Sequence, residues 1–194
     1  YQVSISDHAG CTLDTMITLS QPQDVMNVDL VPFVYPSGTN ISCFGVADGS
    51  IDAMVLGGVA PYTIAWSGPD GFASTQEDIG SLVASDQPYM LVITDDNHCS
   101  FSTNVILTGP ASGLHADVEA PVFPGGANIS CSAAEDGSID LSVGGGNSGY
   151  TYSWSGPNGF TSTHEDITGL SAGAYTATIM DMNGCSLQEV VTLV

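Results

Sequence analysis

The sequence repeats itself, and this repetition constrains the fold more than any other feature. Matching segments lie 88 residues apart: 41–52 with 129–140, 66–72 with 154–160, and, for a partial third copy that opens the chain, 1–11 with 89–99. We therefore predict three parts: the C-terminal strands of a preceding repeat (1–22), a first whole repeat (23–110) and a second whole repeat (111–194).

Each repeat has the pattern of a β-sandwich. Short runs rich in β-branched and aromatic residues alternate with clusters of Gly, Pro, Asp, Asn and Ser, which is typical of sandwiches. No apolar stripe has the period of a helix. We predict an all-β chain of tandem immunoglobulin-like sandwiches, about seven strands each. Trp66 and Trp154 should lie on the third strand in the core, and Leu170 to Tyr175 resembles a tyrosine corner before the sixth strand.

Charge excludes several functions. The chain has 21 Asp and Glu residues and no Lys or Arg, so it lacks the side chains that neutralise phosphates. We therefore expect no nucleic-acid partner and no polybasic contact with lipid. No segment approaches the ~20 apolar residues of a membrane span, so we expect no direct membrane insertion. Resistance to proteases that cut after Lys or Arg, mutual repulsion that extends an array, and a salty or calcium-rich setting would each explain this acidic composition.

The five cysteines are expected to staple the sandwiches. In each repeat one cysteine precedes the second predicted strand and one follows the sixth, which predicts the disulfides Cys43–Cys99 and Cys131–Cys185. Cys11 should then pair upstream of residue 1; the alternative is a free thiol or a link between chains. The Cys and His spacings match no zinc site. Paired cysteines indicate an oxidising, extracytoplasmic location.

The pattern shared by the two repeats resembles a known family. Three stretches carry the likeness: I-S-C at 41–43 and 129–131, D-G-S-I at 136–139, and the segment 170–185. They resemble the SprB-type repeat of Bacteroidota cell-surface adhesins and gliding-motility filaments. The first repeat departs from the pattern in loops, where His98 replaces Gly184 and an insertion follows Leu82. The resemblance implies a secreted adhesin or filament stalk at the outer cell surface, and no particular ligand.

Recurring acidic residues are candidates for Ca²⁺, which prefers carboxylate and carbonyl oxygens. If the predicted disulfides form, Asp48 and Asp95 should lie near the same end of the first sandwich. The candidate ligands are Asp48, Asp95, Asn97, Asp136, Asp181 and Asn183. The alternative is that these are turn residues whose carboxylates accept hydrogen bonds from nearby backbone N–H groups, with diffuse counter-ions screening the charge. Calcium is the only cofactor that the sequence suggests.

Other candidate sites are modification motifs and exposed aromatics. Asn40 and Asn128 begin N-x-S sequons, and Thr15 lies in a D-T-hydrophobic motif for O-glycosylation. Three tyrosines are candidates for contacts with sugars: Tyr62, Tyr150 and Tyr152. We expect no catalytic residues, because the sequence has no G-x-S-x-G elbow and singles out no pair of carboxylates.

Together these patterns predict a structural module of an extracellular adhesin or filament that acts as a stiff spacer. Its expected partners are neighbouring repeats of the same chain, other copies in a filament, and surface glycans. The alternatives are a carbohydrate- or surface-binding module and an accessory domain of a secreted enzyme. Loops such as 67–72 are kept between the copies, which favours the spacer because binding repeats should diverge in their loops.

Overall fold

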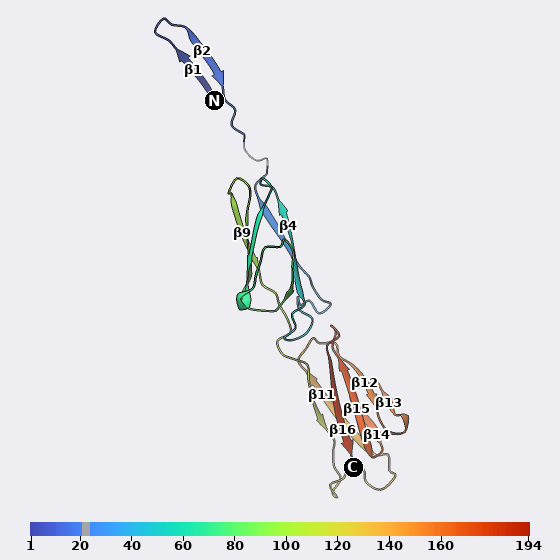
Figure 1. Cartoon of the computed structure of the whole chain (residues 1–194). Coiled ribbons are helices and arrows are strands. Elements are labelled where there is room, and N and C mark those ends of the chain that lie inside the picture. The colour runs from blue at the N-terminus through green and yellow to red at the C-terminus, as the bar shows by residue number, and fades with distance from the viewer. Residues whose placement is uncertain (21–23) are drawn as a thin grey trace.

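The computed structural model describes residues 1–20 and 24–194. A β-hairpin, made of β1 (Gln2–Ser6) and β2 (Thr12–Met16), precedes two β-sandwiches that lie end to end (Figure 1). The predicted boundary at residues 22 and 23 falls outside the described residues.

The first sandwich has seven strands: β3 (Asn27–Pro32), β4 (Gly49–Leu56), β5 (Thr63–Ser67), β6 (Ala73–Ser74), β7 (Ile79–Leu82), β8 (Tyr89–Thr94) and β9 (Ser100–Val105). One sheet has the order β3-β4-β7 and the other β6-β5-β8-β9, with antiparallel neighbours throughout. A 3₁₀ turn, η1 (Pro69–Gly71), links β5 to β6.

The second sandwich repeats this topology with β10 (His115–Glu119), β11 (Gly137–Gly144), β12 (Thr151–Ser155), η2 (Pro157–Gly159), β13 (Thr161–Ser162), β14 (Ile167–Leu170), β15 (Gly173–Met180) and β16 (Ser186–Leu193). Its sheets have the orders β10-β11-β14 and β13-β12-β15-β16. The prediction of an all-β chain with about seven strands per repeat is confirmed. The arrangement fits an immunoglobulin-like sandwich, with the short fourth strand beside the third instead of in the opposite sheet.

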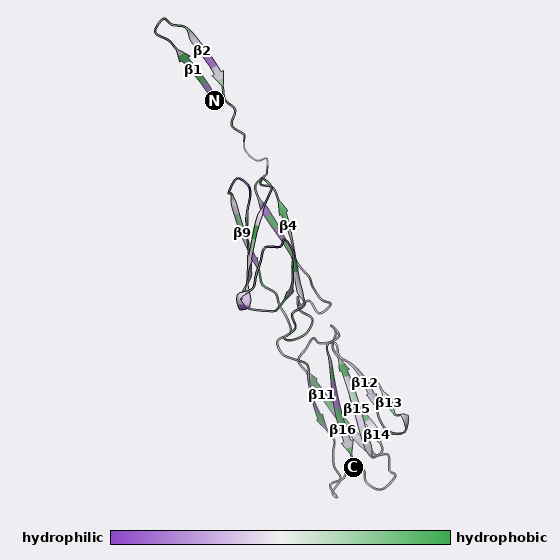
Figure 2. Cartoon of the chain, viewed as in Figure 1, coloured by the Kyte–Doolittle hydropathy of each residue, from purple (hydrophilic) through white to green (hydrophobic). Residues whose placement is uncertain are grey.

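Alternation along the strands builds one core per sandwich. On β8, for example, Tyr89, Leu91 and Ile93 are buried while the residues between them are not. Trp66 on β5 and Trp154 on β12 are buried, as predicted, on the third strand of each sandwich. Hydrophobic residues accordingly gather on the strands of both sandwiches (Figure 2).

The predicted tyrosine corner is present in both sandwiches. The Tyr175 hydroxyl donates a 3.0 Å hydrogen bond to the carbonyl oxygen of Ser171, and that of Tyr89 donates a 3.1 Å bond to the carbonyl oxygen of Val83. A glycine packs flat against each ring: a Cβ built on Gly68 would lie 2.6 Å from Cδ1 of Tyr89. The corner therefore requires glycine at this position.

The β1–β2 hairpin has the same turn as the β8–β9 pair of the first sandwich, but it packs against no second sheet in the described structure. In both turns an aspartate side chain accepts a 2.9 Å bond from the backbone N–H of the cysteine four residues later, Asp7 with Cys11 and Asp95 with Cys99. Val3 and Ile5 are exposed, whereas the matching Leu91 and Ile93 are buried.

The direction of the strands gives each sandwich two distinct ends. The chain enters at the leading end, which in the first sandwich carries the loops 57–62 and 95–99, and in the second 145–150 and 181–185. It leaves at the trailing end, which carries the loops 33–48 and 83–88 in the first sandwich and 120–136 in the second. The trailing end of the first sandwich faces the leading end of the second (Figure 1).

Candidate functional site at the junction of the two sandwiches

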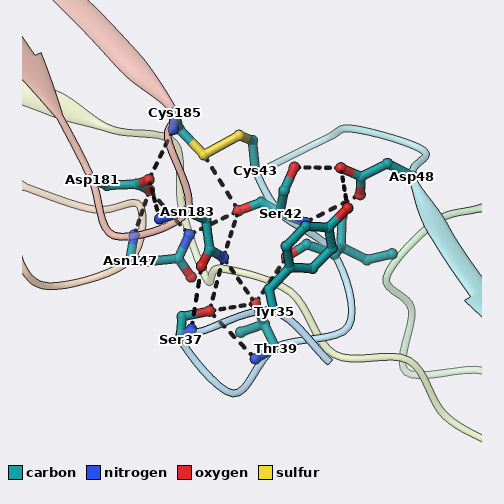
Figure 3. Close-up of a disulfide and its surroundings, with 11 residues drawn as sticks. Tyr35, Ser37, Thr39, Ser42, Cys43, Asp48, Asn147, Asp181, Asn183 and Cys185 are labelled. Carbon is teal, nitrogen blue, oxygen red and sulfur yellow. Dashed lines mark hydrogen bonds between the residues drawn. A yellow bond between two sulfur atoms is a disulfide. The ribbon is translucent and has the colours of Figure 1, made fainter. Parts of the chain in front are cut away.

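The two sandwiches are joined by a disulfide as well as by the chain. Cys43, in the 33–48 loop, is bonded to Cys185, in the 181–185 loop, with 5.8 Å between their Cα atoms and 142 residues between them in sequence (Figure 3). We call these loops, with Asn147 beside them, the junction.

A single carbonyl oxygen is the centre of the junction. The oxygen of Ser42 accepts hydrogen bonds from two side-chain amides of the second sandwich, Asn147 Nδ2 at 2.8 Å and Asn183 Nδ2 at 3.1 Å. Because Ser42 directly precedes Cys43, these bonds hold the backbone that carries the disulfide.

Asn183 also contacts Ser37 and Thr39, which precede Ser42 in the 33–48 loop of the first sandwich. Its Oδ1 accepts a 3.2 Å bond from the N–H of Ser37, and its Nδ2 donates a 2.8 Å bond to Ser37 Oγ. Ser37 Oγ is in turn 2.8 Å from Thr39 Oγ1. The amide of Asn183 thus bridges Ser37 and Ser42 of the 33–48 loop (Figure 3).

Asp181 orients the two asparagines. It is buried, and its Oδ2 accepts bonds from the backbone N and the Nδ2 of Asn147 at 2.9 and 3.0 Å. Its Oδ1 accepts bonds from the backbone N–H groups of Asn183 and Cys185 at 3.0 and 2.9 Å. Burial alone would raise the pKa of Asp181, but these donors outweigh it and lower the pKa below its usual value. The carboxylate is therefore ionised at neutral pH.

Asp48 has the same role in the loop of the first sandwich. Its Oδ1 accepts a 3.1 Å bond from the N–H of Ser42, and its Oδ2 accepts bonds from the hydroxyls of Ser42 and, at 3.0 Å, of Tyr35. Burial alone would raise the pKa of Asp48, but the hydrogen bonds from Ser42 and Tyr35 together outweigh burial and lower the pKa below its usual value. Asp48 thereby orients the carbonyl of Ser42 toward the second sandwich.

The predicted pairing of cysteines is wrong, although their positions before the second strand and after the sixth are as expected. The structure bonds Cys43 to Cys185, and it leaves Cys11, Cys99 and Cys131 as exposed free thiols. The second and sixth strands run in the same direction, so the start of one and the finish of the other lie at opposite ends of a sandwich. An eight-residue strand such as β4 separates them by about 26 Å, far beyond the ~7 Å that a disulfide tolerates between Cα atoms.

The same geometry separates two of the proposed calcium ligands. Asp48 lies at the trailing end of the first sandwich and Asp95 at its leading end, bonded to the N–H groups of Val59 and Cys99, so the expectation that they share an end is wrong. Asp136 repeats the contact of Asp48 through the N–H of Ser130 at 3.1 Å.

Among the described residues, no group of three or more His, Cys, Asp or Glu side chains is arranged to hold a metal ion. The described contacts fit the turn interpretation of Asp48, Asp95, Asp136 and Asp181, and binding of Ca²⁺ stays a prediction. Asn183 turns its Oδ1 to the N–H of Ser37, while Asn97, its counterpart, is exposed.

The two sequon asparagines are buried structural residues. Asn40 donates to the carbonyl of Phe33 at 2.9 Å and accepts from the N–H of Thr108 at 3.0 Å. Asn128 likewise donates to the carbonyls of Ala120 and Pro121 and accepts from the N–H of Val194. They are 8% and 7% exposed, so the Nδ2 that a glycan would modify is already used inside the fold. Thr15 is exposed on β2, and its glycosylation stays a prediction.

The hydroxyls of the candidate sugar-binding tyrosines already make hydrogen bonds within their own sandwich. The hydroxyls of Tyr62 and Tyr150 each donate a 2.7 Å bond to a carbonyl five residues earlier in their own loop. Tyr152 donates a 2.8 Å bond to Glu165, and burial together with this carboxylate raises its pKa to about 12. The three rings are only partly buried, and sugar binding by them stays a prediction.

Sequence reasoning missed Ser37, Thr39 and Asn147. One signal was available, since these are positions where the repeats differ: Ser37 and Thr39 are matched by Gly125 and Ala127, and Asn147 by Val59. In the described structure only one repeat makes each side of the junction, so the polar residues that form it are needed in that repeat alone.

Comparison with known families places one match in each sandwich. Residues 37–71 and 127–159 match the SprB repeat, which confirms the resemblance seen in the sequence. No curated protein matches the chain. The SprB repeat is a structural repeat of adhesin-type cell-surface proteins and is not an enzyme family. None of the helices in the described ranges has the length and apolar character to cross a membrane.

Proposed function

We propose that this pair of SprB-type repeats is a stiff spacer that extends a cell-surface adhesin or filament. The observation that carries the proposal is the disulfide between Cys43 and Cys185, because it joins two sandwiches that each have a complete core of their own. Such a bond adds nothing to the packing inside either core, and its effect is to restrict their relative motion.

The hydrogen bonds of the junction support the same function. Contacts between domains are usually small and polar, so relative motion is the default for a tandem chain. Here Asn147 and Asn183 bridge from the second sandwich to the loop of the first, and the disulfide adds a second covalent path beside the linker. A joint held at several points resists bending and twisting, as a spacer requires.

Residue-resolved NMR relaxation tests this function, because it reports the rotational correlation time of each sandwich separately. In the oxidised chain we expect both sandwiches to tumble together, so that one anisotropic rotational diffusion tensor describes the relaxation of both. In the double variant Cys43→Ser/Cys185→Ser we expect two shorter and separate correlation times. Cys99→Ser/Cys131→Ser is the matched control, because it removes two exposed thiols and keeps the junction. Independent tumbling of the sandwiches in the oxidised wild-type chain would contradict the stiff spacer.

A further inference from the structure

The free cysteines at the two outer ends of the sandwich pair are the counterparts of the bonded ones. Cys99 lies in the first sandwich where Cys185 lies in the second, and Cys131 lies in the second where Cys43 lies in the first. Cys99 is at the leading end, Cys131 at the trailing end, and both are exposed free thiols. The pair therefore carries one unused half of a junction at each end.

The leading end of the first sandwich already has the shape that receives Cys43 in the second. Asp95 is buried and accepts bonds from the N–H groups of Cys99 at 2.9 Å and Val59 at 3.1 Å, as Asp181 does from Cys185 and Asn147. Asn97 matches Asn183, and it is exposed where Asn183 is half-buried by its partner loop. The 95–99 loop is therefore held by the same backbone bonds as the loop that carries Cys185.

The trailing end of the second sandwich likewise matches the one that supplies Cys43. Ser130 precedes Cys131 and is held through its N–H by Asp136, as Ser42 is by Asp48. A cleft of about 500 Å³ flanks Cys43, and its counterpart of about 540 Å³ flanks Cys131. The first cleft is lined in part by the linker residues 106–111, and the second by Val194 in their place.

We propose that Cys131 and Cys99 form the same kind of disulfide between separate copies of this chain, so that a second copy docks end to end with Cys131 of one copy bonded to Cys99 of the next. This inference rests on the proposed function, since it extends the one observed joint into a continuous array. The occupant follows from continuity with that joint, because each outer end presents a surface whose partner is present at the other.

Formation of the bond needs an oxidant, which a small-molecule disulfide such as oxidised glutathione supplies. The thiolate of Cys131 attacks the glutathione disulfide and releases one reduced glutathione. The thiolate of Cys99 then attacks the mixed disulfide and releases the second. Two thiols lose two electrons and two protons, and one glutathione disulfide gains them.

The outer joint lacks part of the polar contact of the observed one. Gly125 and Ala127 stand where Ser37 and Thr39 bind Asn183, and Val59 stands where Asn147 binds Ser42. What remains is the disulfide and a bond from Asn97 to the carbonyl of Ser130. We therefore expect Asn97 to select the partner cysteine, and the loss of its amide to weaken that selection.

The test is oxidation of the Cys11→Ser chain, which keeps Cys99 and Cys131 as its free thiols, in a glutathione redox buffer. The chain carries a net charge of −21, so the reaction is run at 1 M NaCl, where the screening length is about 3 Å. Non-reducing gels show the disulfide-linked oligomers by size. Digestion with a protease that cuts at Asp or Glu, followed by mass spectrometry, identifies the linked peptides. We expect a ladder in which Cys99–Cys131 links far exceed the half of all links that random pairing gives.

Single-thiol variants supply the controls. Cys11→Ser/Cys99→Ser and Cys11→Ser/Cys131→Ser should each stop at dimers, and an equimolar mixture of the two should give mainly the Cys99–Cys131 heterodimer. Adding Asn97→Ala to the Cys11→Ser chain should lower the fraction of Cys99–Cys131 links toward one half, whereas Asn104→Ala, at an exposed position of β9, should not.

Random proportions of the three possible links, or no links while Cys43–Cys185 stays intact, would overturn this inference. Those results leave the proposed function standing, because it depends on shared tumbling of the two sandwiches within one chain. Independent tumbling of that pair would overturn the function, whatever the gel shows.

Discussion

At the scale of single residues, the repeats use aspartates and glycines as local braces. Each aspartate of the Asp-x-x-x-Cys loops accepts backbone N–H groups of its own loop, and one glycine in each sandwich lets a tyrosine ring close over the backbone. These residues recur because every copy of the fold needs them, whether or not it makes a junction.

The tyrosine corner gives the first prediction. Gly68→Ala should destabilise the first sandwich by about 1–3 kcal/mol, because the new Cβ would lie 2.6 Å from the ring of Tyr89. Urea unfolding measures the loss. Gly80→Ala is the matched control, since a Cβ there meets nothing within 4 Å, and equal effects of the two changes would contradict the role of the ring.

Acid should loosen the junction through Asp181. Its pKa is lowered in the folded chain, so its contribution to stability is complete above the unfolded pKa of about 3.9 and is lost as the pH falls through the lower folded value. Urea unfolding of wild type between pH 7 and 3 should show this decline. Asp181→Asn should be less stable at pH 7 and should show a shallower decline. Parallel curves for the two proteins would refute it.

At the scale of elements, the sequence determines more of the fold than of the junction. Period-two alternation and the repeat predicted two seven-stranded sandwiches, with Trp66 and Tyr175 in their roles, because burial inside one repeat leaves a local pattern. The disulfide depends on strand direction: Cys43 precedes one strand of the first repeat and Cys99 follows another, and because these strands run in the same direction the two cysteines lie one strand length apart. Counting strand directions would have excluded that pairing, whereas the contacts of Asn147 depend on how two sandwiches meet.

The loop 33–48 can be converted toward its counterpart to test its contribution. Ser37→Gly/Thr39→Ala gives it the residues of 125 and 127, which removes the hydroxyls that contact Asn183. Losing one or two hydrogen bonds of about 1 kcal/mol each should speed reduction of Cys43–Cys185 by dithiothreitol about five- to thirtyfold, measured by thiol alkylation and mass spectrometry. The control is Gly125→Ser/Ala127→Thr at the far end of the molecule. If that change alters the rate as much, the hydroxyls of the junction are not the cause.

At the scale of the whole molecule, the disulfide closes a loop that contains most of both sandwiches. Its 142-residue separation corresponds to about 5 kcal/mol of lost chain entropy in the unfolded state, which is an upper value because one sandwich can unfold while the other persists. Cys43→Ser/Cys185→Ser should therefore unfold at a lower urea concentration than wild type, and the two sandwiches should separate into two transitions. Cys99→Ser/Cys131→Ser, lacking two thiols that close no loop, should unfold like wild type. Coincident transitions in all three proteins would mean that the sandwiches are coupled by the linker and the amide contacts alone, and that the disulfide does not stabilise them.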